Sequence, residues 1–479
     1  MNLSIESIKE LFSSKNKVRS DGMVMDKKLA NAYNATRQSS LHSSFCFAPS
    51  TNMYFSQNGD VKVCCHNTEF TIGTYPKQSI QEIWTSPKAE ELRKYMRQYD
   101  LAHGCSICEF DMKLGSFEEV RAKHFDEFSR HTKYPVMMEF LLSNTCNLEC
   151  VMCKGEYSSL IRKNREKLPP LQNPYDRTFV KQLEEFIPHL TEARFSGSGE
   201  AFSIDINYEI WDMFIRLNPT CKIMVQTNGT ILTERVKNML HRGNFQIGVS
   251  VDSLVKETYE GIRVNANFDK VMENVKWFSD YCKTKNSYFM LALCVIRQNW
   301  RELPAFIRYC NELGAAAVLH KVWHPKQFAI DNLPATQLQD IYRYLDSAEI
   351  ASGTPLERQN KRHYEYFVSV VKSWMEQPTS AVTNNSEVDA LAATDLLSYL
   401  EASYKTYLDD EYGTEEEKTI ALSQFMNKFE QFLALFPDDQ TREMVSRHAC
   451  KVSTGVMAEA FKKYPVEYLF AEAGNLLKA

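Results

Sequence analysis

The sequence predicts an α/β fold: a partial (β/α)6 barrel, with a small cysteine-rich domain before it and a helical region after it. Three observations support this prediction. Strand-like and helix-like segments alternate in the middle of the chain, cysteines cluster before them, and strand-like segments are lost after them. A chain of 479 residues is long enough for several domains of about 100–200 residues each. We predict an N-terminal helix and connector, a cysteine-rich domain, a barrel and a helical C-terminal region, at 1–40, 41–130, 134–335 and 336–479.

The barrel prediction depends on the regular alternation of segments. Six apolar segments of strand length lie at 136–142, 192–196, 222–226, 246–251, 289–296 and 315–320. One helix-like segment lies between each strand-like segment and the next, at 179–190, 206–217, 232–241, 271–282 and 303–313. Strands joined through helices form right-handed units in a parallel sheet. Six units, where a closed barrel has eight, predict a partial TIM-like barrel.

The flanking regions show different patterns. The first residues predict a short amphipathic helix that leads into a polar connector. A β-hairpin is expected at 52–64, because Asn58-Gly59 forms a tight turn between alternating apolar residues. Segment 79–99 predicts one helix. The C-terminal region predicts helices at 337–345, 363–374, 390–407, 415–436 and 441–473, with a polar linker at 376–386 and a break at Pro465.

Composition narrows the class of protein. The net charge is −5, which gives no global basic field for nucleic acid or for an anionic membrane. The N-terminus lacks the apolar core of a signal peptide, and no run approaches the roughly 18 apolar residues of a membrane span. We therefore expect a cytoplasmic protein without a membrane or nucleic acid partner. The 13 cysteines are an odd number, and eight lie between Cys46 and Cys153, which indicates metal or cluster ligation and argues against disulfides.

Three cysteines follow the first barrel strand with the spacing C-x3-C-x2-C, at Cys146, Cys150 and Cys153. Three thiolates on one loop can hold three irons of a cubane cluster and leave the fourth iron open to an external ligand. The alternative is a structural zinc site. Zinc normally takes four tetrahedral ligands from paired short clips, which this spacing does not match.

At these residues the sequence resembles the radical S-adenosylmethionine (SAM) superfamily. Met152 departs from the aromatic residue usual before the last cysteine, although methionine can also cover an adenine face. The resemblance implies a 4Fe–4S cluster that binds SAM, a 5′-deoxyadenosyl radical made by reductive cleavage, and hydrogen abstraction from a substrate. It also implies an electron donor such as flavodoxin or ferredoxin.

The resemblance extends to the ends of later strands. A G-x-G-E turn after the second strand resembles the GGE element of the superfamily, in which glycines let the backbone approach a ligand and Glu200 pairs with the methionine ammonium. Ser250 or Asp252 is expected at the ribose hydroxyls, and Arg263 at the SAM carboxylate. The implied SAM-binding residues are Gly197, Gly199, Glu200, Asn228, Ser250, Asp252 and Arg263. For each of them the alternative role is helix capping or a surface ion pair.

A second group of cysteines resembles the SPASM/twitch auxiliary-cluster domain of radical SAM enzymes. The resemblance implies a second 4Fe–4S cluster with four thiolate ligands, at Cys46, Cys64, Cys105 and Cys108. Side chains alternate in a strand, so Cys64 and Cys65 cannot both point inward, and Cys64 matches the family pattern. Cys65 or His66 is an alternate ligand. A zinc ribbon is the competing interpretation, and the position before the barrel departs from the usual domain order.

The resemblance implies an enzyme that modifies a peptide by crosslinking, epimerisation or oxidation. No precursor-binding winged helix is recognisable, so dehydrogenation or epimerisation of a small molecule, such as a sugar or aminocyclitol, is the alternative. A non-enzymatic zinc protein is the third possibility. His320, Lys321 and His324 follow the sixth strand and are candidates to face the substrate, although a structural histidine is commoner there. Cys294 lies mid-strand and is either a barrel-facing thiol or a buried small hydrophobe.

Overall fold

The fold is known from a computed structural model that describes residues 24–67, 69–128, 133–376, 391–411, 414–451 and five single positions after them. The chain divides by its contacts into two compact units, Met1–Trp374 and Met375–Ala479. The four-part division expected from the sequence stays a prediction. The helix expected in the first residues, most of the linker at 376–386 and the break at Pro465 lie outside the described residues.

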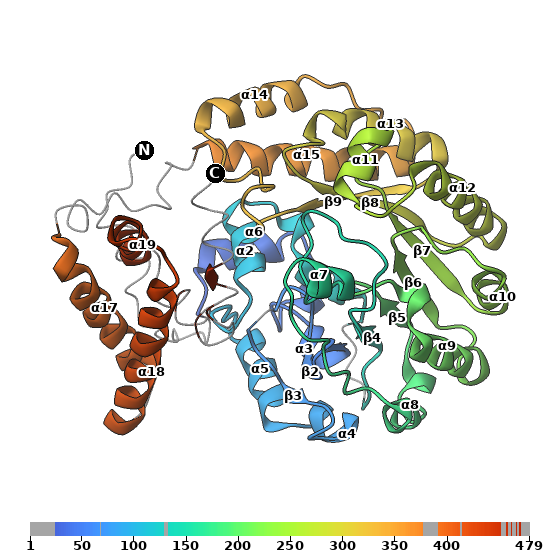
Figure 1. The fold of residues 1–479 in the computed structure, drawn as a ribbon. Coiled ribbons are helices and arrows are strands. Elements are labelled where there is room, and N and C mark those ends of the chain that lie inside the picture. Colours follow the sequence, from blue (N-terminus) through green and yellow to red (C-terminus); the bar gives the residue numbers. More distant parts are fainter. Residues whose placement is uncertain are drawn as a thin grey trace. The chain divides into compact units, whose positions relative to one another are not determined.

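One sheet of nine strands, in the order β3-β2-β1-β4-β5-β6-β7-β8-β9, organises the first unit. Strands β4 to β9 are parallel neighbours in sequence order. Figure 1 shows them along an arc with helices on its outer side, which confirms the α/β fold and the parallel sheet. The strands are β1 Asn52–Phe55, β2 Asp60–Lys62, β3 Gly73–Thr74, β4 Met137–Phe140, β5 Glu192–Phe195, β6 Lys222–Thr227, β7 Phe245–Ser250, β8 Phe289–Val295 and β9 Ala316–Lys321.

The helices between the barrel strands follow the predicted order, and short helices that the sequence did not predict follow β4 and β7. The helices of the barrel region are α7 Ser159–Asn164, α8 Arg177–Leu183, α9 Asp205–Leu217, α10 Glu234–Arg242, α11 Lys256–Ile262, α12 Phe268–Lys285, α13 Leu303–Leu313, α14 Ala335–Asp346 and α15 Pro355–Glu376. The 3-10 helices of the first unit are η1 Ser39–Leu41, η2 Phe117–Glu119, η3 Arg121–Phe128, η4 Ile187–His189, η5 Ala201–Ser203 and η6 Trp300–Glu302.

The cysteine-rich segment extends the barrel sheet. Strands β1 and β2 form the predicted antiparallel hairpin, and Gly59 takes φ +90° in its turn. Strand β1 then pairs in parallel with β4, with Asn52 opposite Met137. The polypeptide that carries the first cysteines and the barrel therefore share one hydrogen-bonded sheet, which the sequence did not predict.

Two local predictions before the barrel were wrong. The single helix expected at 79–99 is two helices, α4 Ile80–Trp84 and α5 Pro87–Arg97. Ser86 between them is extended, its side chain caps α5, and Pro87 starts a helix but cannot continue one. A helix, α2 Lys27–Asn34, lies where a polar connector was expected, and Asp26 caps it. Helix α3 spans Ala48–Thr51, and α6 spans Ser106–Lys113.

The second unit is helical, as predicted. Its helices are α17 Leu396–Glu411, α18 Glu415–Ala434 and α19 Asp439–Lys451, with η7 Ala393–Asp395 before them. Their buried side chains form an apolar core rich in aromatic residues, which include Tyr404, Phe425, Phe429, Phe432 and Phe436. Within the described parts of both units, no helix is both long and apolar enough to cross a membrane.

Candidate functional site

The first candidate site is the loop between β4 and α7, which carries Cys146, Cys150 and Cys153. Asn144 fixes the two ends of this loop. The side-chain amide of Asn144 donates to the carbonyl of Gly155 at 2.8 Å, and the backbone carbonyl of Asn144 accepts from the backbone N–H of Ser159 at 2.7 Å. The three thiols are therefore held in a closed turn of backbone above the end of a buried strand.

Ser158 fastens the middle of the loop to the helix that follows. It is the N-cap of α7 and accepts from the backbone N–H of Ile161, while its hydroxyl donates to the carbonyl of Leu148 at 2.7 Å. Ser158 is buried. The Ser158 side chain thus satisfies a backbone N–H at the start of α7 that has no partner within the helix, and it also orders the backbone between Cys146 and Cys150.

The stretch after α11 pairs with the cysteine loop on both sides of Cys150. The backbone N–H of Glu149 donates to the carbonyl of Val264 at 3.1 Å, and that of Val151 donates to Ile262 at 2.9 Å. These two bonds place Arg263 against the second cysteine. The guanidinium Nη1 of Arg263 lies 3.9 Å from the sulfur of Cys150.

Arg263 also meets Asp252, which follows β7. Arg263 Nε lies 2.7 Å from Asp252 Oδ2, and their side chains are only 8% and 0% exposed. Neither atom of this contact makes a hydrogen bond of acceptable geometry, so each buried group retains bonding capacity. Asp252 Oδ1 accepts from the backbone N–H of Cys294 at 2.7 Å. The pair matches a site for a zwitterionic ligand, because a buried cation and a buried anion both have unmet hydrogen bonds.

Glu200 joins the loops after β5 and β6. Its carboxylate accepts from the hydroxyl of Thr227 at 2.6 Å and from the backbone N–H groups of Asn228 at 2.7 Å and Phe202 at 3.3 Å. Burial raises the pKa of this carboxyl, and these donors oppose the rise. The geometry gives Glu200 a positioning role, while its contact with a methionine ammonium stays a prediction.

The two glycines of this turn have different surroundings. Gly199 has φ +65°, and a Cβ there would lie 2.7 Å from the carbonyl oxygens of Ser143 and Thr145. Gly197 has φ +90°, and its Cβ would meet only the side chain of Leu141. Gly199 therefore lets the turn approach the start of the cysteine loop, which no larger residue allows.

Two further residues predicted to bind SAM, Asn228 and Ser250, have different partners: Asn228 approaches a cysteine sulfur, and Ser250 bonds another side chain. The amide Nδ2 of Asn228 lies 4.0 Å from the sulfur of Cys146 and donates to Asn147 Oδ1 at 2.9 Å. Ser250 accepts from the side chain of Gln226 at 2.9 Å and joins neither thiol network. The structure thus brings Asn228 and Glu200 to Cys146, and brings Arg263 and Asp252 to Cys150.

Burial sets the protonation of the three loop thiols. It raises the pKa of Cys150 to about 11 and that of Cys153 to about 12, and it also raises the pKa of Cys146. The guanidinium of Arg263 opposes the rise at Cys150. The metal-free loop therefore holds thiols, and metal binding there releases protons.

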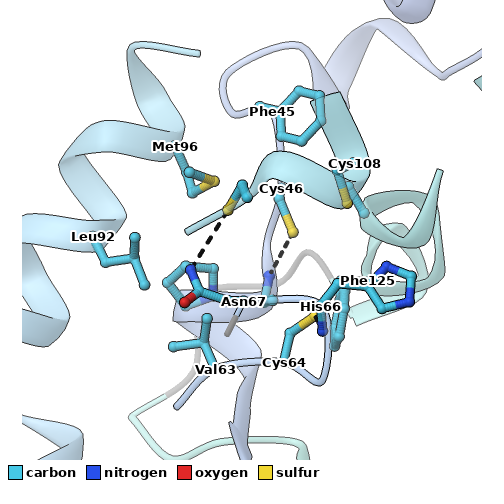
Figure 2. Close-up of a pocket in the computed structure, with 14 residues that line it drawn as sticks. Phe45, Cys46, Val63, Cys64, His66, Asn67, Leu92, Met96, Cys108 and Phe125 are labelled. Atoms are coloured by element: carbon cyan, nitrogen blue, oxygen red, sulfur yellow. Dashed lines mark hydrogen bonds between the residues drawn. The ribbon is translucent and has the colours of Figure 1, made fainter. Parts of the chain in front are cut away.

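The second candidate site is a cavity lined by all four cysteines predicted for the auxiliary cluster: Cys46, Cys64, Cys105 and Cys108. Figure 2 shows Cys46, Cys64 and Cys108 directed toward one space, with apolar side chains around them. The apolar lining residues are Phe45, Ala48, Pro49, Val63, Leu92, Met96, Ala122 and Phe125. Four thiol donors in a largely apolar cavity match a polynuclear iron–sulfur cluster, in which each thiolate ligand binds a different iron.

Three of the four sulfurs accept a hydrogen bond from an N–H group. The backbone N–H of Ala48 donates to Cys46 at 3.4 Å, and that of His66 donates to Cys64 at 3.2 Å. The side-chain amide of Asn67 donates to Cys105 at 3.5 Å. Such donors stabilise thiolate and cluster charge.

The adjacent Cys65 does not line this cavity. Cys65 is exposed, whereas Cys64 is buried and is one of the residues that line the cavity. His66 lies in the cavity wall, where burial, followed by Arg121 and Lys321, lowers the pKa of its ring to about 3. The geometry favours Cys64 as the ligand, as the sequence predicted, and the assignment stays a prediction.

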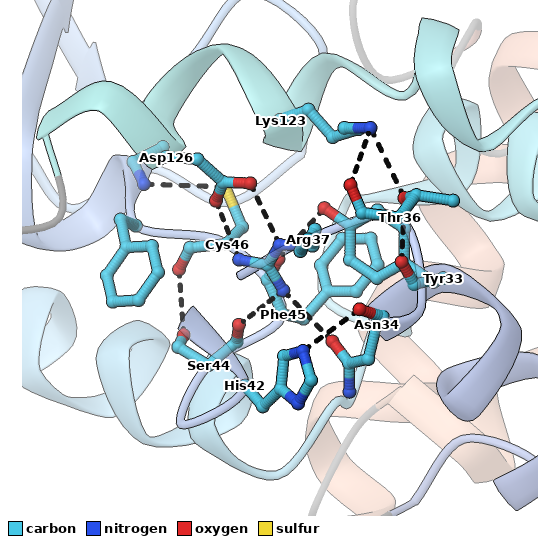
Figure 3. A network of polar contacts seen from close by, with 12 residues as sticks. Tyr33, Asn34, Thr36, Arg37, His42, Ser44, Phe45, Cys46, Lys123 and Asp126 are labelled. Atoms are coloured by element: carbon cyan, nitrogen blue, oxygen red, sulfur yellow. Dashed lines mark hydrogen bonds and ion pairs between the residues drawn. The ribbon is translucent and has the colours of Figure 1, made fainter. Parts of the chain in front are cut away.

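A buried clamp holds the segment that carries Cys46. Arg37 donates from Nε and Nη2 to the two carboxylate oxygens of Asp126, at 2.9 and 2.6 Å, and from Nη1 to the carbonyl of Ser44 at 3.0 Å (Figure 3). The hydroxyl of Ser44 donates to the carbonyl of Cys46 at 2.9 Å. This bidentate pair thus links α2 and η3 to the first cysteine of the cavity.

Sequence reasoning missed several residues that shape both sites. Asn67 and Asn144 lack a motif of their own, although each stands within three residues of a cysteine. The guanidinium of Arg121, whose side chain is 18% exposed, lies 3.6 Å from the carboxylate of Glu139. Only the folded arrangement reveals that a cation stands beside the cavity.

The candidates on the last strands have mixed surroundings. His320 lies opposite Cys294 in the β8–β9 register and is exposed. Lys321 is paired with Asp111 at 3.1 Å. Among the described residues, no three His, Cys, Asp or Glu side chains converge on a site for a single metal ion.

Comparison with known families agrees with this geometry. The family model of the Radical SAM superfamily matches residues 140–310, and that of SPASM, an iron–sulfur cluster-binding domain, matches residues 46–109. A probable GTP 3′,8-cyclase of Methanococcus maripaludis is 27% identical over 37% of this chain and 56% of its own length. A cysteine-type anaerobic sulfatase-maturating enzyme of Clostridium novyi is 31% identical over 29% of this chain and 39% of its own length. The chain thus spans about half the length of these curated relatives, or less.

Solved structures of similar proteins include native anSMEcpe with bound AdoMet, at 19% identity, a TM-score of 0.33, and coverage of 44% of this chain and 59% of that one. Streptococcus suis SuiB bound to S-adenosylmethionine is 12% identical with a TM-score of 0.34, over 54% of this chain and 62% of that one. The three-cysteine loop lies within one matched family region, and the four-cysteine cavity within the other. The chain therefore contains a radical SAM domain, and a SPASM iron–sulfur cluster-binding domain precedes it.

Proposed function

We propose that this chain is a radical SAM enzyme that abstracts hydrogen from a peptide. The SAM-binding 4Fe–4S cluster is held by Cys146, Cys150 and Cys153, and an auxiliary 4Fe–4S cluster is held by the four cysteines that line the cavity. The observation that carries the proposal is the presence of two separate thiol sets, one on the loop after β4 and one lining an apolar cavity, where three of the four sulfurs accept an N–H hydrogen bond.

The residues around the first thiol set hold and orient SAM. A bound cluster with SAM supplies the 5′-deoxyadenosyl radical. Arg263 is placed beside Cys150 to pair with the SAM carboxylate, and Asp252 supplies the unmet acceptor next to it. Glu200 holds the β5 and β6 loops together, so that Asn228 stays at Cys146. These residues position the ligand before any electron arrives.

The peptide substrate is favoured by the auxiliary domain together with the sulfatase-maturating relative, whose name describes action on a protein. The second candidate is a small molecule, and the relatives named GTP 3′,8-cyclase favour it. The two candidates differ in what is consumed. GTP offered to the reduced enzyme tests the second, and short peptides encoded beside the gene test the first by their change in mass.

Metal content tests the two clusters. The anaerobically reconstituted chain should bind about eight irons, since each cubane holds about four. Cys64→Ser should lower this to about four, whereas Cys65→Ser, at the adjacent exposed thiol, should keep about eight. Zinc in place of iron, or equal loss in both variants, would overturn the assignment.

Turnover tests the chemistry. Protein reduced with dithionite and given SAM should release 5′-deoxyadenosine, and Cys150→Ser should abolish the release. Arg263→Gln should bind SAM more weakly for each cluster that it retains, because the guanidinium acts on the ligand; iron content is measured beside SAM binding, since the same change also leaves Asp252 without its paired cation. A Cys150→Ser protein that releases as much 5′-deoxyadenosine as the wild type would refute the proposed site.

A further inference from the structure

A buried polar group joins the helix that carries Cys105 and Cys108 to the last barrel strand. Asp111 lies on α6, and its side chain is 2% exposed. Its Oδ1 accepts from Lys321 Nζ at 3.1 Å and from the hydroxyl of Tyr366 at 2.5 Å, and Lys321 Nζ also donates to that hydroxyl at 2.5 Å. Three segments distant in sequence, α6, β9 and α15, thus meet at one carboxylate oxygen.

The position of Asp111 relates this group to the thiol cavity. Asp111 follows Cys108 by three residues on α6, and residues three apart on a helix are neighbours, about 5–6 Å between Cβ atoms. Cys105 is the N-cap residue of the same helix. A displacement of Asp111 therefore displaces two of the four cavity thiols.

Aromatic rings enclose the ammonium of Lys321. Its Nζ lies 5.5 Å from the ring centroid of Phe110 and 4.9 Å from that of Tyr366. The ring of Trp323 meets Phe110 edge-on at 6.0 Å. Burial, together with the Asp111 carboxylate, raises the pKa of Tyr366, so its hydroxyl keeps the proton that it donates. The rings of Phe110 and Tyr366 therefore hold the ammonium in place through cation–π contacts.

Stability alone is a poor reason for this arrangement. A buried ion pair is often no more stabilising than apolar side chains of similar volume, and removal of one partner leaves an uncompensated charge. Phe110 and Trp323 already pack α6 against the segment after β9. The charges can therefore have an effect that apolar packing would not supply, and the carboxylate of Asp111 acts electrostatically on Cys108, one of the cavity thiols.

We propose that Lys321 is a positioning residue for the auxiliary cluster: it fixes Asp111, and through α6 the sulfurs of Cys105 and Cys108, and its positive charge offsets that of Asp111 beside the cluster. The inference rests on the proposed function, because it requires a cluster at the four thiols. Cluster potentials depend on nearby charge and burial. Loss of the ammonium should therefore make reduction of this cluster harder, and loss of the Asp111 charge should make it easier.

The test compares Lys321→Met with Asp111→Asn in the full chain, with the three loop cysteines replaced by alanine so that only the auxiliary cluster is observed. A redox titration followed by electron paramagnetic resonance should give a more negative midpoint potential for Lys321→Met and a more positive one for Asp111→Asn. Lys256→Met breaks an exposed pair with Asp269 and is the matched control, with an unchanged potential. Shifts in the same direction, or no shifts, would overturn the inference.

A second measurement needs no cluster. In the metal-free chain, amide hydrogen exchange across α6 should be faster in Lys321→Met than in the wild type, and unchanged in Lys256→Met. The double variant Asp111→Asn, Lys321→Met should melt at a higher temperature than Lys321→Met alone, because it leaves no uncompensated charge. If the wild type binds no second cluster, the proposed function fails. If it binds one and α6 exchange is unaltered in Lys321→Met, the positioning role fails.

Discussion

Arg263 shows how one residue serves both architecture and ligand recognition. It is buried, lies between a thiol and a carboxylate, and is placed there by the two backbone bonds that flank it. A guanidinium in this setting has to remain charged, because its fixed planar fork and its partner Asp252 favour the cation. Before any metal or ligand binds, Arg263 therefore has an anionic partner in Asp252 and a neutral thiol neighbour in Cys150.

We predict that Arg263→Met strongly destabilises the metal-free protein. The carboxylate of Asp252 is fully buried and would lose the cation paired with it, which costs about 3–5 kcal/mol in the free energy of unfolding. Urea denaturation followed by circular dichroism measures this loss. Arg235→Met is the control, because its pair with Asp205 is exposed and should contribute at most about 1 kcal/mol. Equal denaturation midpoints for the two variants would contradict the prediction.

His124 predicts a pH dependence. Burial, followed by Arg121 and Arg194, lowers the pKa of its ring to about 2, and the neutral ring meets Arg194 Nη2 at 2.9 Å. The unfolded chain takes up this proton near pH 6.5, whereas the folded chain resists it. The stabilising contribution is therefore complete above about pH 6.5 and is lost progressively as the pH falls from there toward 2.

We predict that His124→Gln flattens this dependence. Between pH 7.5 and pH 5.5 the wild-type protein should lose stability, and the variant should lose less, because glutamine has no proton to take up in the unfolded state. Urea denaturation of the metal-free chain at both pH values gives the comparison. His241→Gln, at an exposed histidine on α10, should retain the wild-type slope. If the free energy of unfolding of His124→Gln fell with pH as steeply as that of the wild type, the pH dependence would not come from His124.

At the scale of elements, the cysteine loop is ordered by its neighbours more than by itself. The G-x-G-E turn contacts it from one side, since the backbone N–H of Glu200 donates to the carbonyl of Thr145 at 2.7 Å. The stretch after α11 contacts it from the other. The loop carries a candidate cluster because three separate strand ends converge on it, which is where parallel sheets place their ligand sites.

Alanine variants at two glycines distinguish the effect of close backbone approach from that of a positive φ. Gly199→Ala should destabilise the chain and reduce iron retention at the loop, because it combines a positive φ with a clash against two carbonyl oxygens. Gly115→Ala has a similar φ of +71° but no atom within 4 Å of the added Cβ, so it should cost only the backbone term of about 1–2 kcal/mol. Thermal unfolding and iron analysis of both variants give the comparison. Equal iron retention in both variants would show that the close approach is not needed.

At the scale of the whole molecule, the two units have separate cores. Among the described residues, the apolar cluster of the second unit is built from α17, α18, α19, Phe436 between the last two helices, and the single positions after them. Such cores unfold as separate cooperative blocks.

We predict that Phe429→Ala destabilises the second unit by about 3–5 kcal/mol, because its ring is fully buried in that core, and leaves the unfolding of the first unit unchanged. Hydrogen exchange resolved along the chain measures both effects. Ile420→Ala on the same helix is the control, since Ile420 is 52% exposed and its loss should change stability by at most about 0.5 kcal/mol. Faster exchange in the barrel strands of Phe429→Ala would contradict the independence of the two units.

Sequence alone determined the features that depend on local pattern. The spacing of Cys146, Cys150 and Cys153 and the alternation of strands and helices predicted the barrel domain, because hydrophobic period reports which faces are buried. The Asn58-Gly59 turn predicted the hairpin, since few residues accept its backbone angles. Side-chain alternation along a strand excluded Cys64 and Cys65 as a joint pair of inward ligands, and the resemblance to the SPASM/twitch pattern favoured Cys64, which stays a prediction.

Tertiary structure alone decided which distant groups meet. The pairing of β1 with β4, the four-cysteine cavity and the contacts of Arg263 join segments many residues apart. The same holds for Asn67, Arg121 and the meeting of Asp111 with Lys321 and Tyr366. Local pattern records whether a residue is buried, but not which residue is buried beside it. That second fact is fixed by the packing of the whole sheet and its helices, so only the folded chain reveals it.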